Sequence, residues 1–255
     1  MGKSDKKRIV LKVGSNVLTK GSNHISRGKI EDIARQIANL QDDYEFIIVS
    51  SGAIAAAKQF VQLEGKEITV KQALASIGQP HLMRIYQENF RELGLLTSQC
   101  LLTYSNFENE QSKTNILNTV NTLVKNNYIP IINENDTVAT DEIKFGDNDK
   151  LAALTAVLLS ADLLIIATNT NGIYTKKSFE KNNVKTIRSV VNIAQLEKEI
   201  ATSISTHGTG GLATKIEAAS ITQKAGIETW IVNGLNDNFI ENALKNSIDF
   251  TKITL

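Results

Sequence analysis

Cysteine and long apolar runs are nearly absent from this sequence. Cys100 is the one cysteine among 255 residues, which excludes a disulfide within the chain and suits a reducing compartment such as the cytoplasm. No window approaches the ~18 uninterrupted apolar residues of a membrane-spanning helix. Near the amino end, Lys12 interrupts the apolar run at residues 9–11, which is too short for the core of a signal peptide. We therefore expect a cytoplasmic chain with no membrane association.

An excess of charge of one sign is also missing. The 28 basic and 27 acidic residues leave a net charge of +1. Proteins that bind nucleic acid usually carry a basic patch or stripe, so this balance argues against such a partner. The apolar fraction of 42% is enough for a sizeable core, and no extended linker interrupts the chain. We expect a single α/β domain over residues 1–255.

What is present is an alternation of apolar runs and helix-like stretches. Strands are predicted at residues 8–13, 45–49, 95–102, 129–132, 163–167, 229–232 and 249–254, the last of them ending the sheet. Helices are predicted at residues 26–39, 53–57, 70–93, 113–125, 151–160 and 211–225, the third of them broken near Gly78 and Pro80. This alternation favours a mostly parallel sheet with helices on both faces. Ligands of such sheets bind beyond the carboxyl ends of the strands, so the turns there are the candidate sites.

The turn after the first strand joins a lysine to a glycine. Lys12 lies in an apolar strand, where an unpartnered charge is costly, so we expect it to point at an anion from the strand's end. Gly14 permits close approach of the backbone, and Ser15 can cap the next segment of the chain, so amides at this turn suit phosphate oxygens. A lysine of an edge strand that reaches water explains Lys12 equally well. Neither a P-loop pattern nor a G-x-G-x-x-G fingerprint is found in the chain.

Two further turns combine glycine with hydroxyl groups. Ser51 and Gly52 come after the second strand, where an ordinary capped helix is the alternative to a binding turn. A glycine-rich loop at residues 206–215 runs into a helix that carries Lys215, an arrangement suited to phosphate. A flexible loop with a solvated lysine is the alternative there.

The densest polar sequence surrounds the fourth strand. Residues 133–136 (Asn-Glu-Asn-Asp) come directly after that strand, and residues 146–149 (Gly-Asp-Asn-Asp) lead into a helix. Carboxylate and carboxamide groups together suit a ligand that carries both an ammonium and a carboxylate group. Two alternatives stay open: a Mg²⁺ site, and helix N-caps at Asp147, Asn148 or Asp149. A projecting hairpin is expected at residues 137–145.

Together these segments resemble the amino-acid kinase family, and within it the branch of glutamate kinases. The matching segments are residues 11–15, 51–56, 77–83, 131–139, 143–149, 172–175 and 208–215, in order over nearly the whole chain. The blocks at residues 133–136 and 146–149 are the most specific to this branch. The other segments are shared with aspartate, acetylglutamate and nucleoside-monophosphate kinases.

The resemblance implies a three-layer αβα sandwich around a mostly parallel sheet. It implies transfer of the γ-phosphoryl group of ATP to the γ-carboxylate of L-glutamate, the first step of proline biosynthesis. Mg²⁺ is expected to travel with ATP, and no separate metal site is assigned. Proline feedback and a homo-oligomer are also expected from the resemblance.

The resemblance further assigns roles to individual residues. Lys12 and Lys215 would stabilise charge on the transferring group, and Asp149 would hold the two lysines in place. Glutamate contacts fall on Ser51, Gly52, Ala53, Asp136 and Asn148. ATP contacts fall on Lys12, Gly14, Ser15, Thr168, Asn169, Thr209, Gly210, Gly211, Leu212, Ala213, Thr214 and Lys215.

The sequence departs from the family pattern in two places. Asn169 stands where many relatives carry aspartate, so the nucleotide contact there is expected to be weaker or made by the backbone. Many relatives also carry an RNA-binding-like module after the kinase domain, which we expect this chain to lack. The alternatives are another small-molecule carboxylate, carbamate or nucleotide kinase of the family, and a non-catalytic nucleotide sensor on the same fold. The joint presence of Lys12, Asp149 and Lys215 argues against the sensor.

Overall fold

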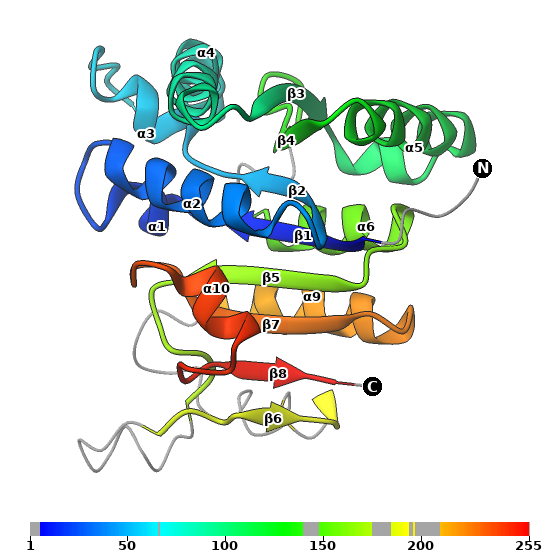
Figure 1. The fold of residues 1–255 in the computed structure, drawn as a ribbon. Helices are drawn as coiled ribbons and strands as arrows, with labels where there is room; N and C mark the ends of the chain where they lie inside the picture. Colours follow the sequence, from blue (N-terminus) through cyan, green and yellow to red (C-terminus); the bar gives the residue numbers. More distant parts are fainter. Residues whose placement is uncertain are drawn as a thin grey trace.

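The structure is a computed structural model that describes residues 6–65, 67–139, 148–174, 185–193, 196 and 210–254. Among these residues, eight strands form one sheet in the order β3-β4-β2-β1-β5-β7-β8-β6 (Figure 1). The strands are β1 (Lys7–Val13), β2 (Tyr44–Ser50), β3 (Leu96–Leu102), β4 (Tyr128–Glu134), β5 (Leu163–Thr168), β6 (Ser189–Val190), β7 (Glu228–Asn233) and β8 (Thr251–Ile253). Of the strand pairs, β7 with β8 is antiparallel and the others are parallel. The prediction of a mostly parallel sheet is confirmed.

Helices cover both faces of the sheet and make the three layers. They are α1 (Ser15–Thr19), α2 (Arg27–Leu40), α3 (Ala53–Ala57), α4 (Ile68–Glu92), α5 (Glu110–Lys125), α6 (Asp149–Leu158), α9 (Gly210–Lys224) and α10 (Phe239–Leu244), with a 3-10 turn, η1 (Tyr104–Phe107). Alternate residues of β1 divide between two cores: Ile9 and Leu11 pack with α2, α4 and α10, whereas Val10 packs with α5, α6 and α9. Figure 1 shows α2 and α10 in front of the strands and α6 and α9 behind them.

The predicted break in α4 is wrong, because the helix runs unbroken from Ile68 to Glu92. Gly78 is where α4 crosses α3: a Cβ atom added there would lie 1.8 Å from the carbonyl oxygen of Ala53. The glycine therefore serves close packing and not a turn. Pro80 deprives the carbonyl group of Ser76 of its N–H partner, and both residues lie on the exposed side of the helix, where water can bind that oxygen.

The last part of the sheet also differs from the prediction. The strand expected at residues 249–254 is β8, which is only three residues long and is not the edge of the sheet, since β6 pairs with its outer side. The short elements β6, α1 and α10 were not predicted, because two to six residues are too few to show a period. Of the expected hairpin, residues 137–139 contain no strand, and residues 140–145 lie outside the described residues.

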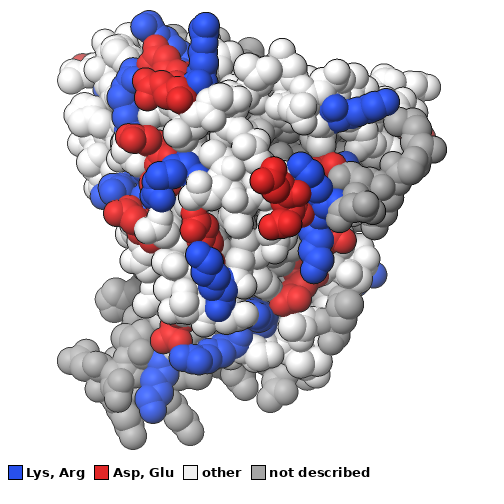
Figure 2. All heavy atoms as spheres, viewed as in Figure 1, with Lys and Arg blue, Asp and Glu red and all other residues white. Residues whose placement is uncertain are grey.

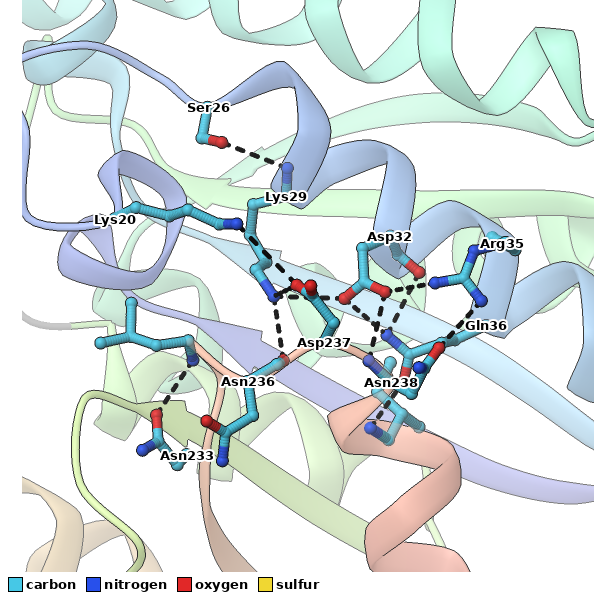
Figure 3. A network of polar contacts seen from close by, with 12 residues as sticks. Lys20, Ser26, Lys29, Asp32, Arg35, Gln36, Asn233, Asn236, Asp237 and Asn238 are labelled. Atoms are coloured by element: carbon cyan, nitrogen blue, oxygen red, sulfur yellow. Dashed lines mark hydrogen bonds and ion pairs between the residues drawn. The ribbon is translucent and has the colours of Figure 1, made fainter.

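A polar network joins α2 to the loop between β7 and α10 (Figure 3). Lys29 is completely buried, and its Nζ lies 3.2 Å from Oδ2 of Asp32 and 3.1 Å from Oδ1 of Asp237. Gln36 Oε1 accepts the backbone N–H of Ile240 at 2.7 Å, in the first turn of α10. A buried ammonium needs such partners, so the network fixes the chain that leaves the carboxyl end of β7.

Surface charges are of mixed sign on the face that Figure 2 presents, where acidic and basic side chains are interspersed. Within the described part of the chain, no helix is both long enough and apolar enough to cross a membrane.

Candidate functional site

The site lies at the carboxyl edge of the central strands. Because β4, β2, β1, β5 and β7 are parallel, the turns after them meet at this one edge. Lys12 of β1 is level with Val49 of β2 and Ile166 of β5. The turns predicted to carry chemistry after β1, β2, β4 and β5 are therefore neighbours.

A carboxylate held between two lysines forms the centre of this edge. Asp149 begins α6 and is completely buried. Its Oδ1 lies 2.7 Å from Nζ of Lys12, and its Oδ2 lies 3.0 Å from Nζ of Lys215 on α9. Thr214 Oγ1 also donates to Oδ2 at 3.0 Å, and Lys215 donates to the carbonyl oxygen of Gly211 at 2.9 Å. One anion thus fixes the directions of two cations from separate elements.

The two lysines of this cluster favour an anionic ligand. The Lys12 and Lys215 side chains are only 4% and 12% exposed, so water solvates them poorly. Two ammonium groups from separate elements converge on one carboxylate in a nearly buried place, an arrangement that suits an anionic ligand. Lys12 is not a lysine of an edge strand that reaches water, because β1 lies between β2 and β5.

Gly14 leaves room beside the lysine ammonium group. A Cβ atom added at Gly14 would lie 3.4 Å from Nζ of Lys12 and 3.8 Å from the carbonyl oxygen of Ala167. Gly14 precedes Ser15, the first residue of α1, and both are half-buried. The turn after β1 therefore brings the backbone close to Lys12 and to the end of β5.

The turn after β2 is fixed to the turn after β1. The backbone N–H of Ser51 donates to the carbonyl oxygen of Val13 at 3.0 Å. Gly52 is the N-cap of α3 and has φ of +106°, a left-handed conformation that favours glycine. A Cβ atom added there would lie 3.2 Å from Cδ1 of Leu18, and the next residue, Ala53, is buried. Ser50 Oγ makes a hydrogen bond of 2.9 Å with the hydroxyl of Tyr86 from α4.

Tyr86 is fully buried, and this burial raises the pKa of its phenol, while the hydrogen bond with Ser50 acts in the opposite direction. The phenol is therefore a neutral support for the turn. Tyr86 was not singled out from the sequence. Its position in the apolar spacing of a helix is typical of an ordinary core residue.

Three carboxamides connect β4, α6 and α4 behind this turn. Asn148 Nδ2 donates to the carbonyl oxygen of Ser50 at 2.8 Å and to Oδ1 of Asn133 at 2.7 Å. Asn133 Nδ2 donates in turn to Oε1 of Gln79 at 2.8 Å. Asn148 occupies the N-cap position of α6 without a side-chain capping bond, and Asp149 lies inside the helix. Asn148 is thus the N-cap by position, but its side chain bonds elsewhere, whereas the alternative is wrong for Asp149. Asp147 lies outside the described residues.

The predicted nucleotide residues lie on the other side of β1. Thr168 ends β5 half-buried and precedes the exposed Asn169; Thr168 Oγ1 lies 3.4 Å from Oδ1 of Asn169. The backbone N–H of Gly234, after β7, donates to the carbonyl oxygen of Thr168 at 2.8 Å. Gly210, Gly211, Leu212, Ala213 and Thr214 form the first turns of α9. Thr209 lies outside the described residues.

Asp136 is half-buried in the turn after β4, near the carboxamides in sequence. Within the described part of the chain, no group of three His, Cys, Asp or Glu side chains is placed to hold a metal ion. Asp149, the most buried carboxylate among residues 133–136 and 148–149, contacts lysines.

The sequence of this chain is similar to those of known proteins. Residues 7–233 match the Amino acid kinase family. A glutamate 5-kinase from Alkaliphilus metalliredigens is 41% identical over 243 residues, which are 94% of this chain and 92% of the relative. Glutamate 5-kinases from Vibrio vulnificus and from a Thermoanaerobacter species are 40% and 44% identical over 94% and 91% of this chain. The chain spans 65% and 64% of the length of these two relatives.

Solved structures agree on the architecture. UMP kinase from Ureaplasma parvum superposes with a TM-score of 0.67 at 17% identity, over 98% of this chain and 99% of its own. Carbamate kinase from Giardia lamblia, bound to AMP-PNP, superposes with a TM-score of 0.69 at 16% identity, over 98% of each chain. The expected αβα fold is confirmed.

Proposed function

Because the chain belongs to the amino acid kinase family, among the glutamate 5-kinases, we propose that Lys12, Asp149 and Lys215 form its phosphoryl-transfer centre. The reaction moves the γ-phosphoryl group of ATP to the γ-carboxylate of L-glutamate and yields glutamyl 5-phosphate, for proline biosynthesis. The observation that carries this proposal is the single buried carboxylate between two lysines at the edge of the sheet, at 2.7 and 3.0 Å.

The two lysines act by charge. Phosphoryl transfer requires alignment of the reacting groups and positive charge on the oxygens of the transferring group. Lys12 and Lys215 supply that charge from two sides, and they also offset the repulsion between the glutamate carboxylate and the triphosphate. Asp149 binds both lysines, so its role is to position their ammonium groups. A carboxylate nucleophile needs no general base.

ATP lies on the β5 and α9 side of β1 in this proposal. Gly14 and Ser15 give the phosphates close access to the backbone, and the first turns of α9, with residues 209–215, hold them from the other side. Thr168 and Asn169 contact the nucleotide at the end of β5. Mg²⁺ enters with ATP, since this ion takes many of its ligands from phosphate oxygens and water.

Glutamate lies on the β2 and β4 side. The turn at Ser51, Gly52 and Ala53 contacts its carboxylate groups, and Asp136 pairs with its ammonium group. Asn148 shapes the pocket through its bonds to Ser50 and Asn133 and contacts the substrate. The nucleophilic γ-carboxylate then faces the lysines at β1.

Proline shares an α-carboxylate and a cationic nitrogen with glutamate, so we propose that it competes for the same pocket. Asp136→Ala should weaken both ligands, because the cationic nitrogen loses its carboxylate partner. The measurement is proline inhibition at several fixed glutamate concentrations. An apparent inhibition constant that does not move with glutamate would contradict the shared pocket.

The substrate is tested by ADP release with ATP, Mg²⁺ and one acceptor at a time. The panel is glutamate, aspartate, acetylglutamate, carbamate and UMP, which covers the alternatives within the family. We expect release to depend on glutamate. Turnover of another acceptor with none for glutamate would overturn the proposal. ATP binding without release of ADP for any acceptor would favour a nucleotide sensor.

We also propose that the enzyme is a single domain over residues 1–255 and that it is located in the cytoplasm.

A further inference from the structure

Gln79 is a buried amide with one half of its hydrogen-bonding capacity unused. It lies on α4 and is 8% exposed. Its Oε1 accepts a hydrogen bond of 2.8 Å from Nδ2 of Asn133, whereas its Nε2 is buried and has no partner among the described residues. A buried donor without an acceptor is costly, so such a group in a folded protein calls for an explanation.

The backbone fixes which atom of Gln79 is the donor. The N–H of Glu134 donates to Oδ1 of Asn133 at 2.9 Å, and a backbone N–H can only donate. The carbonyl oxygen of Ser50 accepts from Nδ2 of Asn148, and that nitrogen also donates to Oδ1 of Asn133. Asn133 must therefore donate from Nδ2 to Gln79, and the acceptor atom of Gln79 must be Oε1. The NH₂ group of Gln79 is left facing away from this chain of bonds.

The free donor lies on the substrate side of the site. Gly78, its neighbour, packs against the carbonyl oxygen of Ala53 in the turn after β2. Asn133 lies on β4, and Asn148 precedes Asp149 at the phosphoryl-transfer centre. In the proposed function ATP lies beyond β1, at β5 and α9, which leaves the side of β2 and β4 for the amino-acid substrate.

We propose that Gln79 is a glutamate-binding residue, whose Nε2 donates to a carboxylate oxygen of the bound substrate. This assignment rests on the proposed function. An NH₂ group requires an acceptor, and in glutamate only the two carboxylates accept hydrogen bonds, since the ammonium group can only donate. Gln79 Oε1 meanwhile holds Asn133, so the same side chain joins substrate binding to the carboxamide chain that ends at Asn148.

The direct test is Gln79→Glu. The new carboxylate has the shape of the amide and still accepts from Asn133, but it presents an anionic oxygen where the donor was. We expect KM for glutamate to rise about 10–100-fold, with KM for ATP within about twofold, because a hydrogen bond to a charged group is replaced by repulsion. Steady-state kinetics against each substrate measure this split, and kcat at saturating glutamate should change much less.

Asn89→Asp is the matched control. Asn89 lies on the same helix and is also 8% exposed, but its Nδ2 donates to the carbonyl oxygen of Ile85 within the helix. This variant buries the same new charge away from the site, so it should lower the melting temperature without a selective rise in KM for glutamate. A selective rise in both variants would show a general effect of the charge on α4 and would overturn the assignment.

Gln79→Leu tests the proposal without a new charge, in case the acid at this position prevents folding. It should weaken glutamate binding, measured by calorimetric titration, while titration with ATP is unchanged. If the wild-type protein uses glutamate and both Gln79 variants bind it normally, the assignment fails and the proposed function stands. A wild-type protein that neither binds nor turns over glutamate would overturn both.

Discussion

Asp149→Asn removes the charge that holds the two lysines and keeps the shape of the side chain. An amide can offer its one oxygen to Lys12 or to Lys215, and its NH₂ group then faces the other ammonium. Asp149 is completely buried, and the lysine side chains are 4% and 12% exposed, so water cannot replace the lost partner. Removing one partner from such a buried pair typically costs about 3–5 kcal/mol.

This cost predicts a large change in thermal stability. In a chain of this size each kcal/mol shifts the melting temperature by roughly 2–4 °C, so we expect a fall of about 6–20 °C without ligand. ATP should restore part of it, because its phosphates give the lysines new anionic partners. Thermal unfolding with and without ATP measures both effects, and kcat should fall because the lysines lose their alignment.

Glu217→Gln provides the control for this prediction. Lys150 and Glu217 join the same two helices, α6 and α9, through an ion pair of 3.2 Å whose side chains are about half exposed. An exposed pair contributes about 0–1 kcal/mol, so this variant should melt within about 4 °C of the wild type. If Asp149→Asn behaves like Glu217→Gln, with unchanged kcat, then Asp149 does not organise the lysines.

The remaining predictions concern the lysines and the carboxamides. Lys12→Ala and Lys215→Ala should each lower kcat about 10²–10³-fold in a protein that is still folded by circular dichroism, because each removes positive charge from the transferring group. A folded Lys215→Ala enzyme with near-normal kcat would remove that lysine from the mechanism. Asn148→Ala should chiefly raise KM for glutamate, since it frees Asn133 and the turn at Ser50. A fall in kcat with unchanged KM would assign Asn148 to the chemistry instead.

The sequence predicts the central sheet well, because parallel strands buried on both faces appear as short continuous runs of Val, Ile and Leu. It fails where a tertiary contact overrides a local signal. Gly78 and Pro80 are typical of a helix break, yet α4 continues through both residues. The glycine is needed for close packing against α3, and on the exposed side at Pro80 water can bind the carbonyl oxygen that lacks an N–H partner. The edge strand β6 and the helix α10 are too short to predict from a period.

Local patterns in the sequence indicate individual candidate residues of the site but not their arrangement. A lysine in an apolar strand and a lysine after a glycine-rich loop each stand out, so Lys12 and Lys215 were both candidates, and the structure brings them together at Asp149. That Asp149 lies between them depends on how β1, α6 and α9 meet; no local pattern reveals this, and it was expected only from the resemblance to the family. The contact between Gln79 and Asn133 could not be predicted for a related reason: the position of Gln79 in a helix gives no sign that its side chain is buried against Asn133.

The chemical identity of the product tests the central claim most directly. The protein is incubated with ATP, Mg²⁺, glutamate and hydroxylamine, which converts an acyl phosphate to a stable hydroxamate. We expect γ-glutamyl hydroxamate that requires glutamate, ATP and the divalent ion together, and that falls about 10²–10³-fold with Lys215→Ala. Hydroxamate formed from aspartate or acetylglutamate, with none from glutamate, would contradict the account.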